Sequence, residues 1–304
     1  MCTFVTVNMG IVYIILSGIC FLIVNFFVKT LGPGQSNIFT DHLQLQEYPA
    51  HELVLARSVV SFAMSWVIVK RKKLPVFGNN KKWLIIRGLS GTIALTIFFY
   101  TMHYLPLAVA LTVQYLAPIF TIIFAMILLR ERIRWIQWPF IGLAFGGTLL
   151  LVYANQSDQP DLAGIDPFWL GLGMISAVLS GVAYVSIMKL KQTDAPITIV
   201  MYFPMVAIPF MVVLCIWEFT MPQGIEWIFL LIIGVFTQLA QITMTRALHA
   251  GNAATIVPFQ YLGAIYGFLV GYFIFLESLS STLIVGMVLV LAGVIVNSIL
   301  RQRA

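Results

Sequence analysis

Gln114-Tyr115-Leu116 recurs as Gln260-Tyr261-Leu262, 146 residues further along the chain. The same shift aligns other residues without a gap: Gly88 with Gly234, His103 with His249, and Glu131 with Glu277. Apolar matches weigh little in an apolar chain. A histidine, a Gln-Tyr pair and a glutamate that all align at one offset are much harder to obtain by chance. The sequence therefore indicates an internal duplication.

The composition is that of a membrane protein rather than of a soluble domain. Of the 304 residues, 61% are hydrophobic and 9% are charged, whereas about 25% of residues are charged in soluble domains. The mean hydropathy is +0.99. The net charge of +6 comes from loops between apolar runs, so we expect no nucleic-acid partner. Cys2, Cys20 and Cys215 lack metal or redox spacing. The first apolar run has no basic segment before it and is read as a retained span.

Ten apolar runs are long enough to cross a bilayer, whose hydrocarbon core of about 30 Å needs about twenty residues per helix. The runs in the first half are 9–29, 52–69, 83–104, 108–129 and 135–153. Those in the second half are 168–188, 197–217, 227–248, 253–275 and 281–300. We predict an all-α integral membrane protein with one five-helix repeat in residues 1–155 and another in residues 156–304. Because an odd number of spans separates equivalent positions, the two repeats are inverted around a central cavity.

Loop charges give the orientation in the membrane. Basic residues gather at 70–73, 81–82, 130–134, 189–191 and 301–303, and acidic residues gather at 41–47, 158–166 and 218–226. With the N-terminus inside, the basic loops all fall on the cytoplasmic side, as the positive-inside rule expects. We therefore expect a multi-pass protein of the plasma membrane, a bacterial inner membrane, with both termini cytoplasmic. The outer loop 31–50 is the longest and has no close counterpart in the second half.

Short motifs accompany these spans. They are Leu111-Thr112-Val113-Gln114-Tyr115-Leu116-Ala117-Pro118, Leu129-Arg130-Glu131-Arg132-Ile133 before Gly142, and Phe275-Leu276-Glu277-Ser278-Leu279 before Gly286 and Gly293. Together with Arg57 in the second span, they resemble the drug/metabolite transporter superfamily, specifically its EamA-type ten-helix transporters. The second half departs from that pattern at Ala264, where relatives often have proline. The resemblance implies a substrate cavity near the midplane of the membrane. The third, fourth, eighth and ninth helices would line it, and the first, second, sixth and seventh would act as gates.

The third and eighth spans each carry polar residues on one helical face. At helical spacing these are Thr92, Thr96, Tyr100 and His103 in the third span, and Gln238 and Gln241 in the eighth. In lipid such a stripe must face protein or a water-filled path, because unsatisfied polar groups cost several kcal/mol there. We predict that all of them except the two threonines contact substrate. The alternatives are hydrogen bonds between helices and, for His103, an interfacial histidine.

The fourth and ninth spans carry a stripe of small residues. Gly263, Gly267 and Gly271 correspond under the shift to Ala117, Thr121 and Ala125. Small residues at this spacing allow helices to approach closely. We therefore predict that the two spans meet each other.

The repeated Gln-Tyr pairs lie beside this stripe. Gln114 and Gln260 share nearly the same faces as the small residues, and we assign them to helix packing or gating, with substrate contact equally open. Tyr115 and Tyr261 point about 100° away and are predicted to contact substrate. The prolines that accompany the pairs, Pro118 and Pro258, can kink the helices where gates bend.

The gating spans contain a few polar residues that we also predict to contact substrate: Asn25, Arg57, Tyr184 and Tyr202. A charged arginine inside a span is costly and should be partnered or face the pathway. Glu52, five residues before Arg57, is the candidate partner.

Several classes of protein lack their signatures in this sequence. No carboxylate lies in the middle of a span, no P-loop is present, and no histidine and carboxylate cluster has metal spacing. We therefore expect no enzyme activity, no metal and no cofactor.

Our hypothesis is a secondary transporter, an exporter or exchanger, acting by alternating access through a cavity with little fixed charge. Its substrate would be a small organic metabolite such as an amino acid, a nucleobase or an amphipathic compound, and it would be a monomer or homodimer in the lipid bilayer. The alternative is an integral-membrane enzyme or scaffold acting on lipid-linked partners.

Overall fold

The protein is a bundle of helices in the computed structural model. The structure describes residues 2–32, 45–105, 107–130, 135, 138–140, 142–143, 145–147, 150, 167–251, 253–274, 284–286, 288–289 and 292–293. Within these residues all regular structure is helical. Six of the described helices are long and apolar enough to cross a membrane. The chain is therefore a multi-pass membrane protein.

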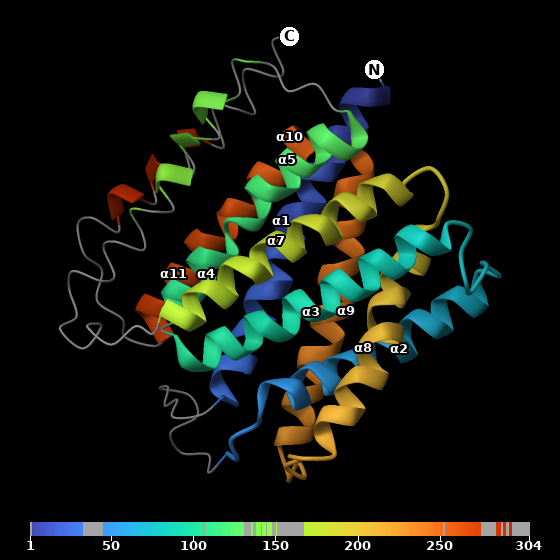
Figure 1. Ribbon diagram of the computed structural model, residues 1–304, viewed down its shortest axis with the longest axis vertical. Helices are drawn as coiled ribbons and strands as arrows, with labels where there is room; N and C mark the ends of the chain where they lie inside the picture. Colours follow the sequence, from blue (N-terminus) through green and yellow to red (C-terminus); the bar gives the residue numbers. More distant parts are fainter. Residues whose placement is uncertain are drawn as a thin grey trace.

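The helices run in the order that the apolar runs predict (Figure 1). The first half contains α1 (Cys2–Thr30), α2 (Ala50–Arg71), α3 (Lys81–Tyr104), α4 (Leu107–Gln114) and α5 (Ala117–Leu129). The second half contains α7 (Pro167–Leu190), α8 (Pro196–Cys215), α9 (Glu226–Ala250), α10 (Ala253–Ile256), the 3-10 helix η3 (Val257–Tyr261) and α11 (Leu262–Ile274). The predicted spans 135–153 and 281–300, with Glu131 and Glu277, lie largely outside the described residues, so the count of ten remains a prediction.

The predicted fourth and ninth spans are each interrupted at the repeated motif. α4 ends at Gln114, and α5 begins at Ala117 with Pro118 in its first turn. In a continuous helix the ring of Pro118 would clash with the carbonyl of Gln114, four residues earlier, and one hydrogen bond would be lost. In the ninth span the interruption is η3, which has Pro258 at its start. Different prolines therefore interrupt the two spans at equivalent places.

Helix bounds in the two halves follow the 146-residue shift. α2 begins at Ala50 and α8 at Pro196, and α3 and α9 end at Tyr104 and Ala250. α1 and α7 do not follow it, because they end 160 positions apart, at residue 30 and residue 190. The loop after α1 is the longer one, which accounts for the difference.

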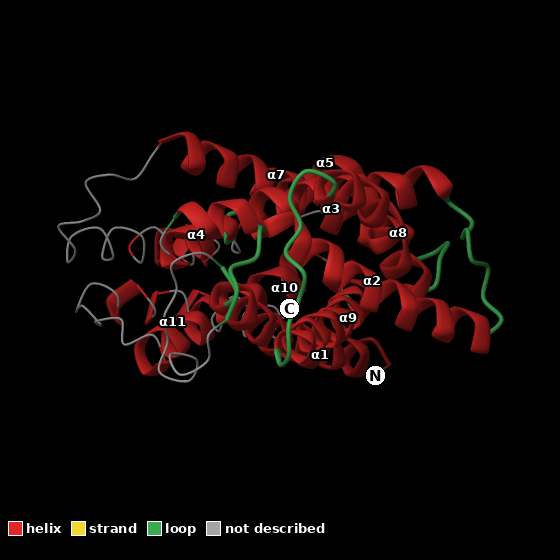
Figure 2. Cartoon of the chain, turned by 90° about the horizontal axis from the view of Figure 1, so that it is seen from below, coloured by secondary structure: helices red, strands yellow, loops and turns green. Residues whose placement is uncertain are grey.

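The helices form two layers, and each helix of one layer has its sequence counterpart in the other layer. In the end view of Figure 2, α3, α5, α7 and α8 lie on one side of the bundle, and α1, α2, α9 and α11 lie on the other. Within the layers, α3 packs on α7 and α1 packs on α9, while α2 and α8 pack on each other between the layers. Exchanging each helix for its counterpart turns one layer into the other. This is the arrangement that a two-fold related duplication produces.

A pair of equivalent glycines allows close packing between the halves. A Cβ atom on Gly88 would lie 2.7 Å from Cγ2 of Val206. A Cβ atom on Gly234 would overlap the side chain of Val60. Gly88 and Gly234 correspond under the shift, and so do Val60 and Val206. Each half therefore places its α2 or α8 valine against the glycine of the other half.

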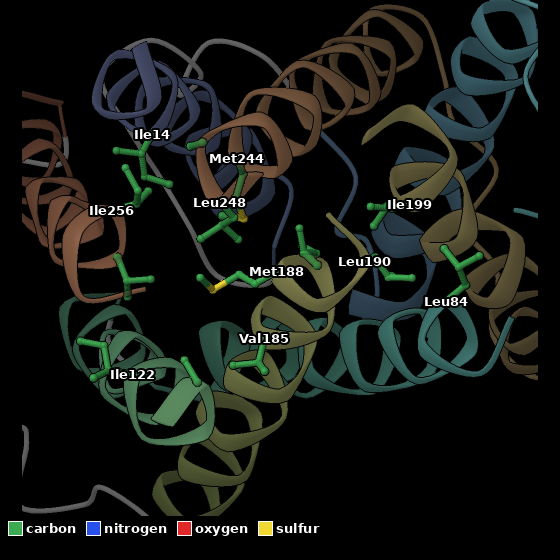
Figure 3. Close-up of a cluster of buried hydrophobic side chains, with 14 of the residues drawn as sticks. Ile14, Leu84, Ile122, Val185, Met188, Leu190, Ile199, Met244, Leu248 and Ile256 are labelled. Carbon is green, nitrogen blue, oxygen red and sulfur yellow. The ribbon is translucent and has the colours of Figure 1, made fainter. Parts of the chain in front are cut away.

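Two apolar clusters fill the bundle on either side of its middle. One includes Ile14, Leu84, Val185, Met244 and Leu248, which come from α1, α3, α7 and α9 and are drawn in Figure 3. The other is built around Val28, Tyr48, Leu53, Phe98 and Phe99. All ten of these side chains are at least nine-tenths buried. The clusters hold the helices around the space between them.

Gly234→Ala is expected to destabilise the protein by about 1–3 kcal/mol, because its methyl group would overpack against Val60. Thermal unfolding of the purified protein measures this, and adding Val60→Ala should recover most of the loss. Gly171→Ala is the matched control at a helical glycine with no described atom within 4 Å of an added Cβ. An unchanged melting temperature for Gly234→Ala would contradict the close approach.

Candidate functional site

A cavity of about 180 Å³ lies in the middle of the bundle. It shares Ile14 and Met244 with one apolar cluster, and Phe98 and Phe99 with the other. Side chains from α1, α2, α3, α4, α5, α7, α8, α9, η3 and α11 line it. α1 and α7, which the resemblance implied would act as gates, therefore line the cavity as well.

Arg57 extends from α2 into this cavity. Its side chain is 1% exposed, and its guanidinium lies over the rings of Phe99 and Phe203, with Cζ 5.6 Å from each centroid. Its Nε and Nη2 have no hydrogen-bond partner within the described chain. Glu52, the candidate partner, instead accepts a hydrogen bond from the backbone N–H of Thr220 at 2.9 Å. The aromatic faces are therefore the main stabilising neighbours of this charge.

Arg87 brings a second positive charge that sequence reasoning missed. Its Nη2 donates to Oε1 of Gln241 at 2.8 Å, and its Cζ lies 5.5 Å from the centroid of the same Phe203 ring. Its Nε is buried without a described partner. Near the start of a span an arginine commonly extends toward the interface. The sequence pattern therefore did not indicate that Arg87 reaches the cavity. Gly91, one turn after Arg87, leaves room for the arginine head group, because a Cβ atom there would overlap the Arg87 guanidinium.

The amide side chains of Gln114 and Gln260 differ in their hydrogen bonds. Gln114 Nε2 donates to Ser180 Oγ at 2.9 Å, and Gln114 Oε1 accepts from Ser176 Oγ at 3.0 Å, so this glutamine joins α4 to α7. Its counterpart Gln260 has a buried Nε2 with no described partner. Both line the cavity, as Asn25 and Tyr184 do.

The interrupted spans meet each other at the motif tyrosines. The rings of Tyr115 and Tyr261 lie 6.3 Å apart, and a Cβ atom on Gly263 would lie 2.7 Å from the Tyr115 hydroxyl. Tyr115, Pro118 and Gly263 line the cavity, whereas Tyr261 is buried behind the lining. The side-chain surroundings of Pro258, Gly267 and Gly271 lie outside what the structure describes.

The buried Ala117, Thr121 and Ala125 stripe of α5 contacts α7. An added Cβ on Gly181 would lie 2.7 Å from Cβ of Phe120. The sequence pattern showed that this face of α5 permits close packing, but it did not show which helix packs there.

Four further candidates lie away from the cavity lining. Gln238 accepts from Ser61 and donates to Ser65, which ties α9 to α2. The Tyr100 hydroxyl and Nδ1 of His51 are 3.0 Å apart. Nε2 of His103 is buried without a described partner, and the Tyr202 hydroxyl donates to the carbonyl of Phe77 at 2.7 Å. None of these four side chains is part of the cavity lining.

One end of the bundle carries hydrogen bonds around Asp194. We call them the inner latch, because the loop charges predict that this end faces the cytoplasm. The backbone N–H groups of Asn79 and Asn80 donate to the Asp194 carboxylate at 2.6 and 3.2 Å. The Asn79 side chain donates to the carbonyl of Thr193 at 2.6 Å. These bonds join the start of α3 to the loop before α8.

The other end carries the outer latch, around Glu226. Its carboxylate accepts from the backbone N–H of Gln46 at 2.7 Å and from the Tyr48 hydroxyl at 2.6 Å. Burial and the bond to Glu226 raise the pKa of Tyr48, so the hydroxyl stays protonated and keeps donating. The latch joins the start of α9 to the segment before α2.

The two latches correspond under the 146-residue shift. Tyr48 is equivalent to Asp194, and Asn80 is equivalent to Glu226. The carboxylate therefore comes from a different one of the two joined segments in each latch. In the inner latch it lies in the loop before α8, and in the outer latch it is the first residue of α9.

A multi-pass helical bundle around a central cavity that contains polar side chains is an architecture found in membrane transporters. The family model for EamA-like transporters matches residues 8–153 and 167–299. The chain belongs to the EamA-like transporter family, as the sequence motifs predicted.

Several relatives are named as transporters. The chain is 27% identical to the pseudopaline exporter of Pseudomonas aeruginosa over 95% of both chains. It is 24% identical to human solute carrier family 35 member G1, over 86% of this chain and 71% of the relative. It is 23% identical to the riboflavin transporter of Vibrio cholerae, over 88% and 85%. A solved crystal structure at 18% identity superposes with a TM-score of 0.74 over 97% of this chain and 98% of the other, and so shares the fold.

The two glutamines of α9 should behave differently when replaced. Gln238→Met is expected to destabilise the protein by about 1–3 kcal/mol, because Ser61 and Ser65 lose their shared partner. Transport per folded molecule should stay within about twofold of the parent, because Gln238 does not line the cavity. Gln241→Met, the matched variant one turn away, should lower transport, because the Arg87 guanidinium loses its acceptor. The reverse pattern would contradict this division.

Proposed function

We propose that the protein is a secondary transporter that moves a small organic solute across the plasma membrane by alternating access. The observation that carries the proposal is the polar cavity in the middle of the bundle with a hydrogen-bonded latch at each end. A solute in such a cavity leaves on the side whose latch opens. Alternation follows when the two latches do not open together.

The proposal includes two inverted repeats, residues 1–155 and 156–304, with five spans each. The matching helix bounds, the exchanged glycine and valine contacts and the exchanged layers support it. The latches agree with the orientation expected from loop charges. The inner latch joins loops expected in the cytoplasm, and the outer latch joins loops expected outside. Both termini would then be cytoplasmic, in a bacterial inner membrane.

Site roles follow from position. We assign substrate contact to the polar lining residues Asn25, Arg57, Arg87, Gln114, Tyr115, Tyr184, Gln241 and Gln260. We assign gating to residues that hold the ends of helices or the contacts between them: Tyr48, Tyr100, Asp194, Tyr202 and Glu226. Gln238 ties α9 to α2 and has no part in gating. Tyr261 supports Tyr115 from behind the lining.

Relatives support transport of small metabolites and differ in direction. One is named as an exporter and another as an S-adenosylmethionine uptake transporter. The exporter matches this chain over the larger share, 95% of its length against 68% for the uptake transporter. We therefore propose export or exchange of a small organic metabolite.

Flux assays in proteoliposomes test the function directly. Purified protein should move at least one solute from a panel of amino acids, nucleobases, organic acids and amphipathic amines faster than empty vesicles do. Heat-unfolded protein reconstituted in the same way is the control. Failure of every solute to move in either direction would refute the transport function.

Locking the inner latch should stop transport. Asn79→Cys with Thr193→Cys, in a background without Cys2, Cys20 and Cys215, places two thiols where the Asn79 side chain now reaches the carbonyl of Thr193. Oxidation should reduce flux by at least about tenfold, because the cavity can no longer open on that side. Reduction with dithiothreitol should restore it.

Each single-cysteine variant, oxidised in the same way, is the control for nonspecific damage. A fully cross-linked protein that transports at the parental rate would show that this end does not open during the cycle.

A further inference from the structure

We propose that the transported solute is an organic carboxylate, and that its carboxylate group binds between the guanidinium groups of Arg57 and Arg87. This inference rests on the proposed function and names the chemical class of its substrate. Sequence analysis had predicted a cavity with little fixed charge, whereas the cavity carries two positive side chains.

Unpaired hydrogen-bonding groups in the cavity are all of one kind. Among the described residues that line the cavity, the buried side-chain atoms without a hydrogen-bond partner are Arg57 Nε and Nη2, Arg87 Nε and Gln260 Nε2. All of them are N–H donors. A ligand that satisfies them must offer acceptors. A carboxylate offers two oxygens and can accept from arginine in the bidentate geometry.

The charge of the cavity points to the same ligand. Both guanidiniums lie within 5.6 Å of the centroid of the Phe203 ring and repel each other. None of the described lining residues is acidic. Like charges in a space of low dielectric constant repel strongly, and an anion placed between them reverses the sign of the interaction. A cation would add to the repulsion, and a neutral amide would leave it unchanged.

The apolar part of the lining indicates the chemical character of the remainder of the ligand. Phe21, Phe26, Leu95 and Phe98 form apolar walls around the polar groups. The cavity of about 180 Å³ suits a small molecule. The solute is therefore a carboxylic acid with a compact apolar or aromatic portion rather than a strongly hydrophilic polyanion.

Thermal-shift measurements on the purified full-length protein test the proposal. The probes are four acids, each with its neutral amide: benzoate, 3-phenylpropionate, indole-3-acetate and N-acetylphenylalanine. At least one acid should raise the melting temperature by several degrees at a concentration where its amide shifts it by less than about 1 °C, because binding to the folded state alone stabilises it. The cationic probe 3-phenylpropylamine should give no shift.

Variants connect the shift to the two arginines. Arg57→Gln and Arg87→Gln should each weaken binding of the stabilising acid by at least about tenfold, as expected when a charge-assisted bidentate contact is lost. Arg57→Lys keeps the charge without the bidentate geometry and should lose part of the affinity. Arg246→Gln, an exposed arginine over Tyr13 and outside the cavity, should bind as the parent does.

The ligand-free melting temperature gives a second readout. Arg57→Gln should melt a few degrees higher than the parent without ligand, because a buried charge with two unpaired donors is removed. A purely structural arginine would give the opposite change.

The carboxylate proposal is overturned if none of the four acids stabilises the protein, if the amides stabilise it equally, or if phenyl phosphate alone does so. The flux panel separates this result from the transport function. If a neutral or cationic solute moves and Arg57→Gln retains its flux, transport stands and the carboxylate class fails. If the acids bind selectively and no solute moves, the site stands and transport fails.

Discussion

The central constraint on this molecule is the cost of holding two guanidinium groups inside a membrane when none of the described residues around them is a carboxylate. An arginine at the centre of a membrane helix costs about 2.5–3.5 kcal/mol on insertion scales. Cation–π contacts with Phe99 and Phe203 return about 0.5–2 kcal/mol each, and Gln241 supplies one charged hydrogen bond. Gly91 makes room for the Arg87 head group. These contacts offset part of the cost and leave several donors unpaired. A bound ligand that offers hydrogen-bond acceptors would therefore stabilise these arginines further.

Equivalent contacts from the two halves of the chain hold the helices around that cavity. Gly88 accepts Val206 and Gly234 accepts Val60, so each half brings its own valine to the glycine of the other. In lipid, helix association depends on close packing rather than on a hydrophobic driving force. Contacts between the two halves therefore hold the middle of the bundle together. Gln238, joined to Ser61 and Ser65, adds a polar contact across the same α2 and α9 pair.

Much of this architecture was predictable from the sequence, for identifiable reasons. Apolar runs report helices directly, and α2, α3, α8 and α9 lie within a few residues of their predicted bounds. The repeated Gln-Tyr pair marks the place where both interrupted spans break, because proline cannot continue a helix there. Arg87 escaped notice because its distance from the end of its span did not show which way the side chain turns.

The partners of individual residues were also out of reach. Gln114 bonds to serines of α7, while Nε2 of the equivalent Gln260 has no described partner. One sequence pattern therefore has two different structural outcomes. The small-residue face of α5 shows the same limit, because Gly181 of α7 is its neighbour. Periodicity identifies a face, and only the assembled bundle identifies what covers it.

The exchange of the carboxylate between the two latches has an energetic consequence. Asp194 accepts from two backbone amides of the opposing segment, whereas Glu226 accepts from one amide and the Tyr48 hydroxyl. In the proposed alternating-access cycle, two identical latches would favour the two facing states equally. Two different latches would favour one of them, through loops that lie outside the cavity. Changes in these loops could then alter the preferred direction of transport without altering the binding site.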